Sequence, residues 1–496
     1  AAPNADVTFE PVWYSRRGVD FAGEARYLLG SQQGRFQFDY LPDDAIANRN
    51  RSRLHIEHLA RLPAGWRLTV DAADVSDPRY FEDFAQGPEG TSQPFVRRLA
   101  TLTYRDDHWR VAGLLQQFQT IDRQLAASDR PYARLPSLQA AGNWFLGPQG
   151  RIALGFDAEV VNFDRTSGIT GWRLDAAPAV GLDLTGAGYF LRPSAGMRYT
   201  RYDLSGTAPG VNDRPQRSLP FASLDAGLVF ERYAGNRGQR RVTLEPRLLY
   251  LYTPYRDQSA IPLFDTALPD TNIVSLFRPN RYIGGDRLSD ANEVTLGLTT
   301  QAFASRSGQR FLSATLGESF YLDEPRVTLP GEAAIVRHRS ALIADIDWRA
   351  WRDLGLRYVL AWDPETARTA RASVTLQYRR SGQQVANLSY RYLRGQMEQA
   401  DASLAWPLGR HWDAYARGVY SLMDRKSIEN FAGFQYRGSC WALRLVTRRS
   451  VSSRTGTIDS GFYLQLELNG LSSVGTGADA FLERSIRGYS ASNSNR

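Results

Sequence analysis

The chain has 496 residues, of which 43% are hydrophobic, and a mean hydropathy of −0.40. No stretch approaches the roughly 18 consecutive apolar residues of a helical membrane span, so composition excludes a helical membrane protein. The formal charge is +8, and Lys426 is the single lysine among the basic residues. The arginines are scattered rather than gathered into a patch, so no nucleic-acid partner is expected. Their excess reflects either biased base composition or recognition of anionic phosphate and carboxylate groups.

Hydrophobic residues recur at every second position along much of the chain, which predicts strands with one apolar and one polar face. Phe36, Phe38 and Tyr40 show this alternation early in the chain. The pattern is clearest in the second half, where it predicts strands over 342–348, 354–362, 372–378, 386–392, 402–408, 412–422 and 462–468.

The predicted connections alternate in length from residue 349 onward. Turns near 349–353, 380–383, 409–411 and 437–439 are short, and loops near 363–370, 393–400, 423–430 and 449–459 are longer. Short periplasmic turns, longer external loops and aromatic residues close to the short turns are typical of outer-membrane β-barrels. The prediction is an all-β fold, a large transmembrane antiparallel β-barrel with strands in the mid-twenties, located in the outer membrane of a Gram-negative bacterium.

Residues 253–293 interrupt the strand pattern with four prolines and the pair Gly284-Gly285. Loops of this length are usually functional or disordered. Apolar residues such as Ile273, Leu276 and Phe277 argue against disorder, so a structured loop that folds over or into the barrel is predicted.

No catalytic centre is predicted. His55 and His58 are three residues apart, which in a strand places them on opposite faces, and no nucleophile elbow of the form G-x-S-x-G is present. Carboxylate pairs such as Asp43-Asp44 are typical of solvated turns, so no metal and no cofactor are assigned. Cys440 is the only cysteine and cannot form an internal disulfide.

Ordered sequence blocks along nearly the whole chain resemble one family, the lipopolysaccharide-assembly outer-membrane protein LptD. The resemblance rests on the blocks Arg16–Gly18, Glu24–Leu28, Asp39–Asp44, Val75–Phe81, Leu244–Arg247, Tyr250–Ser259, Leu276–Arg278, Gly285–Arg287, Ala291–Glu293, Tyr436–Arg444 and Gly470–Ser473. It implies a barrel of about 26 strands over residues 1–496, with the last clear strand near 460–469 and a C-terminal tail over 470–496. The family's amino-terminal periplasmic jelly-roll domain is absent from this sequence.

The resemblance also implies a function. Proteins of this family receive lipopolysaccharide from a periplasmic bridge of Lpt proteins, carry the lipoprotein LptE as a plug in the lumen, and release lipid through a seam between the first and last strands. No covalent chemistry is involved. By this resemblance the candidate lateral-gate residues are Val7, Phe9, Pro11, Trp13, Phe462, Leu464, Leu466 and Leu468. The candidate lumen and loop residues are Tyr255, Arg256, Asp257, Arg278, Asp286 and Arg287.

Pro11 and Cys440 carry further expectations. Pro11 donates no backbone hydrogen bond, so it weakens a strand near the amino terminus unless it lies at a strand end. Many family members have two adjacent cysteines where this chain has Ser439-Cys440, and they pair with cysteines in the amino-terminal region. The resemblance therefore implies a disulfide from Cys440 to that region, the alternative being a buried inert thiol.

Two other functions stay open at this point. A general diffusion porin should conduct ions without a partner and should lack the 253–293 block. A lipid-modifying barrel enzyme should lose activity on replacement of one of the five histidines.

Overall fold

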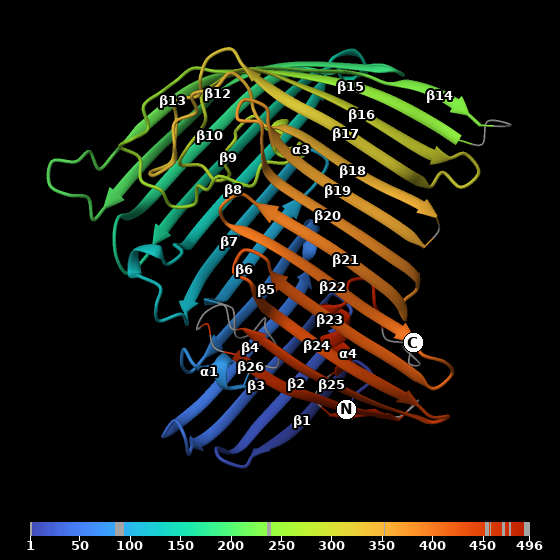
Figure 1. The fold of residues 1–496 in the computed structure, drawn as a ribbon. Helices are drawn as coiled ribbons and strands as arrows, with labels where there is room; N and C mark the ends of the chain where they lie inside the picture. Colours follow the sequence, from blue (N-terminus) through green and yellow to red (C-terminus); the bar gives the residue numbers. More distant parts are fainter. Residues whose placement is uncertain are drawn as a thin grey trace.

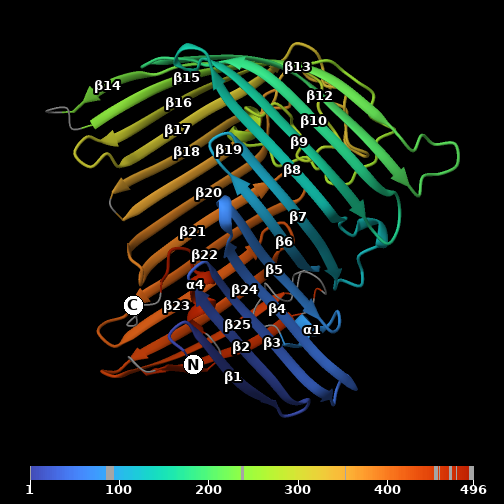
Figure 2. The ribbon, with the colours of Figure 1, turned by 180° about the vertical axis from the view of Figure 1, so that it is seen from behind.

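The computed structural model describes residues 2–84, 94–235, 240–351, 353–451, 456, 458–468, 472–475 and 478–490. They form a single 27-stranded antiparallel sheet that curls into a barrel (Figures 1 and 2). The strands are β1 (Ala5–Tyr14), β2 (Gly18–Leu29), β3 (Gln32–Asp44), β4 (Arg49–Arg61), β5 (Trp66–Val75), β6 (Phe95–Arg105), β7 (Trp109–Thr120), β8 (Ala133–Leu146), β9 (Ile152–Asp164), β10 (Thr170–Leu182), β11 (Leu184–Thr185), β12 (Tyr189–Ser205), β13 (Gln216–Leu228), β14 (Phe230–Ala234), β15 (Arg240–Thr253), β16 (Ala291–Ala304), β17 (Arg310–Tyr321), β18 (Leu342–Trp351), β19 (Leu354–Asp363), β20 (Arg368–Ser381), β21 (Gln384–Leu393), β22 (Met397–Pro407), β23 (Trp412–Ser421), β24 (Lys426–Arg437), β25 (Trp441–Val451), β26 (Ile458–Leu468) and β27 (Ser472–Gly475).

Helical structure is sparse in the described residues. Their α-helices are α1 (Tyr80–Phe84), α3 (Ile273–Leu276) and α4 (Ala478–Ser485), and short 3-10 turns span Pro63–Gly65, Ala127–Asp129 and Pro148–Gly150. Among the described residues no helix is long and apolar enough to cross a bilayer.

Each strand pairs with the strand that precedes it and the one that follows it in the chain, so the sheet is a continuous meander. Two short segments are continuations rather than new strands. β14 keeps the register of β13 on β15, and β11 keeps the register of β10 on β12. The prediction of about 26 antiparallel strands is confirmed, and every strand predicted in the second half lies on an observed strand.

The alternating residues sort to the two faces of the wall. On β26, Phe462 and Leu464 are exposed, whereas Tyr463 and Gln465, which alternate with them, are buried. Inward-facing charges pair across neighbouring strands, as in Arg417 on Asp401 at 2.8 Å. An apolar exterior and a charged interior are what a lipid-embedded barrel requires.

The predicted alternation of loop lengths after residue 349 is wrong in its detail. The connections expected to be long between β19 and β20, β21 and β22, and β23 and β24 are tight turns, because polar residues at the strand ends continue the hydrogen-bonded ladder beyond the apolar pattern. The long connections lie earlier in the chain, at 76–94, 121–132, 206–215, 254–290 and 322–341. All five are at one end of the barrel, which is therefore the external end, and β1 begins at the opposite, periplasmic end.

Aromatic residues collect at the periplasmic end, as predicted. Trp412, Tyr436 and Trp441 form a chain, with ring centroids 5.1 and 5.3 Å apart. The rings of Tyr378 and Trp406 extend the belt over neighbouring strands at 5.8 Å. Such a belt fixes the depth of the barrel in the membrane interface.

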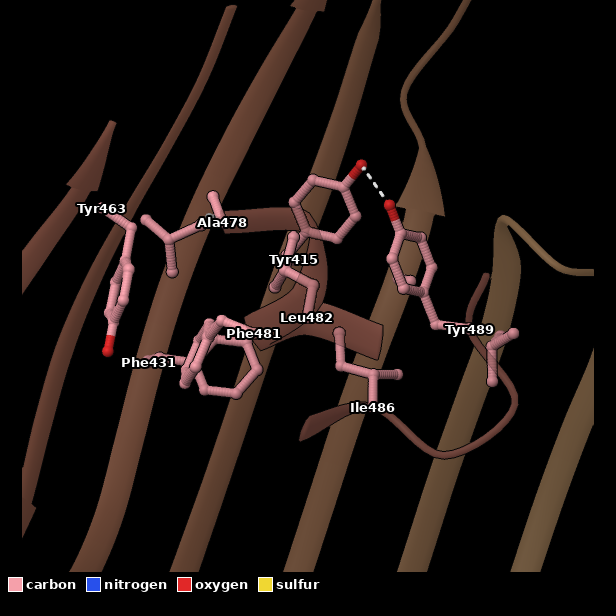
Figure 3. Close-up of a cluster of buried hydrophobic side chains, with 11 residues drawn as sticks. Tyr415, Phe431, Tyr463, Ala478, Phe481, Leu482, Ile486 and Tyr489 are labelled. Atoms are coloured by element: carbon pink, nitrogen blue, oxygen red, sulfur yellow. Dashed lines mark hydrogen bonds between the residues drawn. The ribbon is translucent and has the colours of Figure 1, made fainter. Parts of the chain in front are cut away.

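The segment after β27 does not trail away from the barrel; it folds back into the lumen against strands β21–β26 (Figure 3). Phe481 of α4 stacks on Tyr463 at 4.7 Å and meets Phe431 edge-on at 5.0 Å. Beyond the helix, the Tyr489 hydroxyl donates a hydrogen bond to the Tyr415 hydroxyl at 3.2 Å. This C-terminal segment (478–490) gives the last strands an apolar core that a hollow barrel would lack; residues 491–496 of the predicted tail lie outside the described residues.

Replacing Phe481 with alanine should lower the thermal stability of the barrel. The ring is 2% exposed, and removing a buried phenylalanine costs about 3–5 kcal/mol. The check is the temperature at which the band of the folded barrel disappears on unheated denaturing gels. Val336→Ala, in an exposed loop position, is the matched control and should leave that temperature unchanged. Equal temperatures for the Phe481 and Val336 variants would contradict the role given to the C-terminal segment.

Candidate functional site: an open seam and a lumenal strap

The first and last strands lie at the same side of the barrel (Figures 1 and 2), and the hydrogen-bonded ladder is interrupted between them. β1 pairs along its whole length with β2, and β26 pairs with β25. Within the part of the chain that the structure describes, the other edge of β26 is covered only over Gln465–Leu468, by the short strand β27. No pairing within the described residues joins β1 to β26 or β27. The two strands thus border an open seam.

Pro11 lies inside β1, opposite Phe21 of β2, and not at a strand end. The N–H of Leu28 donates to the carbonyl of Asn4, which fixes the alternation of hydrogen-bonded pairs along this register. Even-numbered residues of β1 therefore bond to β2, and odd-numbered ones direct their backbone groups toward the seam. Pro11 is odd-numbered, so the N–H that it lacks is one that would have faced β26.

The side chains of the eight candidate gate residues point outward rather than across the seam. Val7, Trp13 and Phe462 are 77%, 75% and 76% exposed. Phe9 leans back on Phe21 of β2 at 6.3 Å. Both borders of the seam therefore present apolar surface on the membrane side.

The connection between β15 and β16, residues 254–290, crosses the lumen as a strap. Its main anchor is Arg173 of β10, which is buried. Its guanidinium donates to Asp265 at 2.7 and 2.8 Å, to Asp286 at 2.8 Å and to Glu159 of β9 at 2.6 Å. Burial alone would raise the pKa of Asp265, but the hydrogen bond and charge of Arg173 outweigh it and lower the pKa to about 2. The contact between Arg173 and Asp265 is thus an ion pair at neutral pH.

A second buried arginine holds the strap from the neighbouring wall. Arg217 of β13 donates to the carbonyls of Gly285 and Asp286 at 2.8 and 3.0 Å and to the side chain of Gln258. The hydroxyl of Tyr202 donates to Asp286 at 3.0 Å. Asp286, fully buried, also accepts the backbone N–H groups of Phe264 and Asp265 at 2.7 and 2.9 Å. Each donor compensates part of the cost of burying a carboxylate.

Helix α3 holds the middle of the strap against the inner wall by apolar contact. Asn272 caps it through a capping box with Ser275. Leu276 packs with Ile343 and Ala361 on the facing strands. A Cβ on Gly297 of β16 would come within 2.7 Å of Phe277, so glycine at this position lets the strap lie flat on the sheet.

The six predicted lumen and loop residues divide into two groups. Asp286 and Arg287 are buried, and Arg287 donates to the carbonyl of Ile261 at 2.8 Å. The other four lie at or near the strap surface. There Tyr255 is covered by the Arg326 guanidinium at 3.8 Å, and Asp257 accepts the backbone N–H of Ser259 at 2.9 Å. Sequence reasoning missed the anchors Arg173, Arg217, Tyr202 and Asp265. For Arg173 and Arg217 the one available signal was a charge on the inward register of a strand.

Cys440 is exposed in the turn between β24 and β25, at the periplasmic end where β1 begins. The alternative of a buried inert thiol is therefore wrong. His55 and His58 face opposite sides of β4, as predicted: His55 contacts Asp71 at 3.0 Å, and His58 bonds to the hydroxyl of Tyr27.

A curled meander of this size, apolar outside and charged inside, with an interior strap and one open seam, defines a large transmembrane β-barrel of the outer membrane. The family model described as LPS transport system D, LptD, matches residues 49–412. The chain belongs to the LptD family.

Relatives agree along nearly the whole chain. The LPS-assembly protein LptD of Nitrosococcus oceani is 38% identical, over 98% of this chain and 66% of the relative. That of Aromatoleum aromaticum is 35% identical, over 98% and 62%. That of Thiobacillus denitrificans is 36% identical, over 99% and 67%. The chain thus spans about two thirds of the length of these relatives. Among solved structures, the FrpB iron transporter of Neisseria meningitidis aligns with 90% of this chain and 78% of its own, at 9% identity and a TM-score of 0.38.

Replacing Asp286 with alanine should release the strap from the wall. The change leaves Arg173 short of a carboxylate and buried N–H groups unpaired, and breaking a buried ion pair costs about 3–5 kcal/mol. Limited trypsin digestion should then cut between residues 254 and 290 while the barrel still resists heat. Asp257→Ala, in the same loop, should retain the resistance of the unaltered protein. An uncut strap in the Asp286 variant would contradict this account of the anchor.

Proposed function

We propose that this chain assembles lipopolysaccharide at the outer membrane, and that lipid leaves sideways through the seam between β1 and β26 while the polar portion passes through the lumen. The observation that carries the proposal is the interrupted ladder between the first and last strands of a protein in the LptD family. In hydrocarbon an unpaired backbone group costs several kcal/mol, so an open edge is retained only where it has a use.

The properties of the seam support lateral passage of lipid. Its two borders carry exposed apolar side chains from Val7 to Trp13 and from Phe462 to Leu468, which match acyl chains. Pro11 removes one donor from the edge that closure would have to pair. Closing the seam would therefore form at least one hydrogen bond fewer than the length of β1 allows.

The remaining expectations concern partners. We propose that the lipoprotein LptE plugs the lumen and that the periplasmic bridge of Lpt proteins delivers lipopolysaccharide from below through the amino-terminal region of the full protein. In support, the strap and the C-terminal segment line only parts of the inner wall, and β1 starts at the periplasmic end.

The test is complementation of a strain depleted of its own copy. The full-length protein should restore lipopolysaccharide to the cell surface, measured by its accessibility to an external modifying enzyme. Cysteine pairs placed across the seam, one at Phe9 and the other scanned over Phe462 and Leu464, should block delivery when oxidised and recover it on reduction.

A pair at Ala25 and Phe36, which lie opposite each other on the bonded strands β2 and β3, is the matched control and should not interfere. Failure of the unaltered protein to restore delivery would overturn the proposed function. Normal delivery through an oxidised, fully cross-linked seam would overturn lateral release alone.

Cys440 should form a disulfide with a cysteine in the amino-terminal region of the full-length protein. The thiol is exposed at the periplasmic end, the compartment where disulfides form. Non-reducing gels should show a mobility shift that reductant abolishes and that Cys440→Ser lacks, while Ser439→Ala keeps it. The same shift in the Cys440 variant would refute the pairing.

A further inference from the structure

Four arginines at the periplasmic end of strands β4–β7 form two directly opposed pairs. Arg61 of β4 lies opposite Arg67 of β5, and Arg105 of β6 lies opposite Arg110 of β7. Side chains at opposed positions have Cβ atoms about 5 Å apart, and like charges there are destabilising. We refer to these four residues as the arginine cluster.

The cluster faces the lumen. Trp66 and Tyr104 alternate with Arg67 and Arg105 and pack on each other at 5.2 Å on the outer, aromatic face. The arginines therefore lie on the inner face. Arg67, Arg105 and Arg110 line an internal cavity of about 1070 Å³ that reaches up to the strap residues Asp265 and Gly285.

Most of the other charged residues that line this cavity form ion pairs with one another. Glu159 and Asp265 accept from Arg173, and Asp175 accepts from Arg198 at 2.9 Å. Among the described residues none of the four clustered arginines forms an ion pair. The nearest carboxylate in register is Asp157, which lines the same cavity two strands from Arg110, with its backbone roughly 10 Å away. The cluster thus keeps a positive charge without a direct counter-charge.

We propose that the arginine cluster binds phosphate groups of the lipopolysaccharide as it enters the lumen, an inference that rests on the proposed function. Guanidinium groups bind phosphate oxygens in bidentate fashion, and two opposed arginines can hold one phosphate between them. The two like-charge pairs are then favourable only when an anion is bound. All four side chains are exposed, unlike the buried anchor Arg173, which suits a ligand that arrives and leaves.

The test uses the full-length protein, purified with its partners in detergent, and the double variant Arg105→Gln with Arg110→Gln. Binding is measured for lipopolysaccharide, for lipopolysaccharide dephosphorylated with hydrofluoric acid, and for inorganic pyrophosphate. The variant should bind intact lipopolysaccharide and pyrophosphate about tenfold more weakly and the dephosphorylated form as the unaltered protein does. The control is Arg357→Gln with Arg391→Gln, exposed lumenal arginines of β19 and β21, which should leave all three affinities unchanged.

The outcomes separate the two proposals. Unchanged affinity of the cluster variant for intact lipopolysaccharide and pyrophosphate would overturn the phosphate site and leave the proposed function standing. Cluster-dependent binding of pyrophosphate, with no binding of lipopolysaccharide, would support an anion site whose source is free phosphate and would count against the proposed function. Loss of a co-purifying protein at unchanged phosphate binding would assign the cluster to an acidic partner surface and overturn the proposal.

The variant should fold normally, because the substitutions remove repulsion between opposed like charges. The heat resistance of its band on unheated gels checks this point. A loss of heat resistance together with a loss of binding to dephosphorylated lipopolysaccharide would show that the two arginines have a structural role only, and would overturn the proposal.

Discussion

The backbone hydrogen bond is the interaction on which this molecule depends. A bilayer offers no partner for an N–H or C=O group, so each strand must be bonded on both edges. From β2 to β25 the strands meet this requirement, apart from the short continuations β11 and β14, which pair on one edge. The meander order lets every pairing form between neighbours in the chain. The seam between β1 and β26 is the place where the requirement is relaxed. Pro11 is tolerated there because the donor that it lacks faces an edge without a bonded partner.

The inner face of the barrel carries paired charges, whereas its outer face is apolar. Arg173 would be prohibitively expensive to bury alone, and the carboxylates of Glu159, Asp265 and Asp286 compensate it. Two of these carboxylates belong to the strap, so the same ion pairs that neutralise the wall also fix the loop. The strap also makes apolar contacts through α3. Each of these contacts is weaker than an ion pair, but together they cover a second part of the wall. A long loop thereby becomes part of the barrel without any regular pairing of its own.

The alternation of apolar and polar residues made the strands predictable, because a period of two can be recognised within each segment alone. The ends of the strands were less predictable, since polar residues around Arg368 and Met397 extend the ladder beyond the apolar pattern. The anchors of the strap were out of reach for a different reason. Arg173 binds Asp286 across more than a hundred residues of chain. Only the curvature of the whole sheet decides which inward-facing arginine Asp286 contacts. The fold of the C-terminal segment was unpredictable for the same reason, because its contacts come from six strands.

The two borders of the seam are unequal mechanically. β26 is backed on its inner face by the core around Phe481, so bending it outward would separate packed aromatic rings. Within the described residues β1 has a comparable contact only at its end, where Tyr14 meets Phe84 of α1 at 5.4 Å, and its inward residues Thr8 and Glu10 are exposed to the lumen. Any widening of the seam should therefore come from the amino-terminal side. β1 and β2 should move outward, while β25 and β26 stay in place.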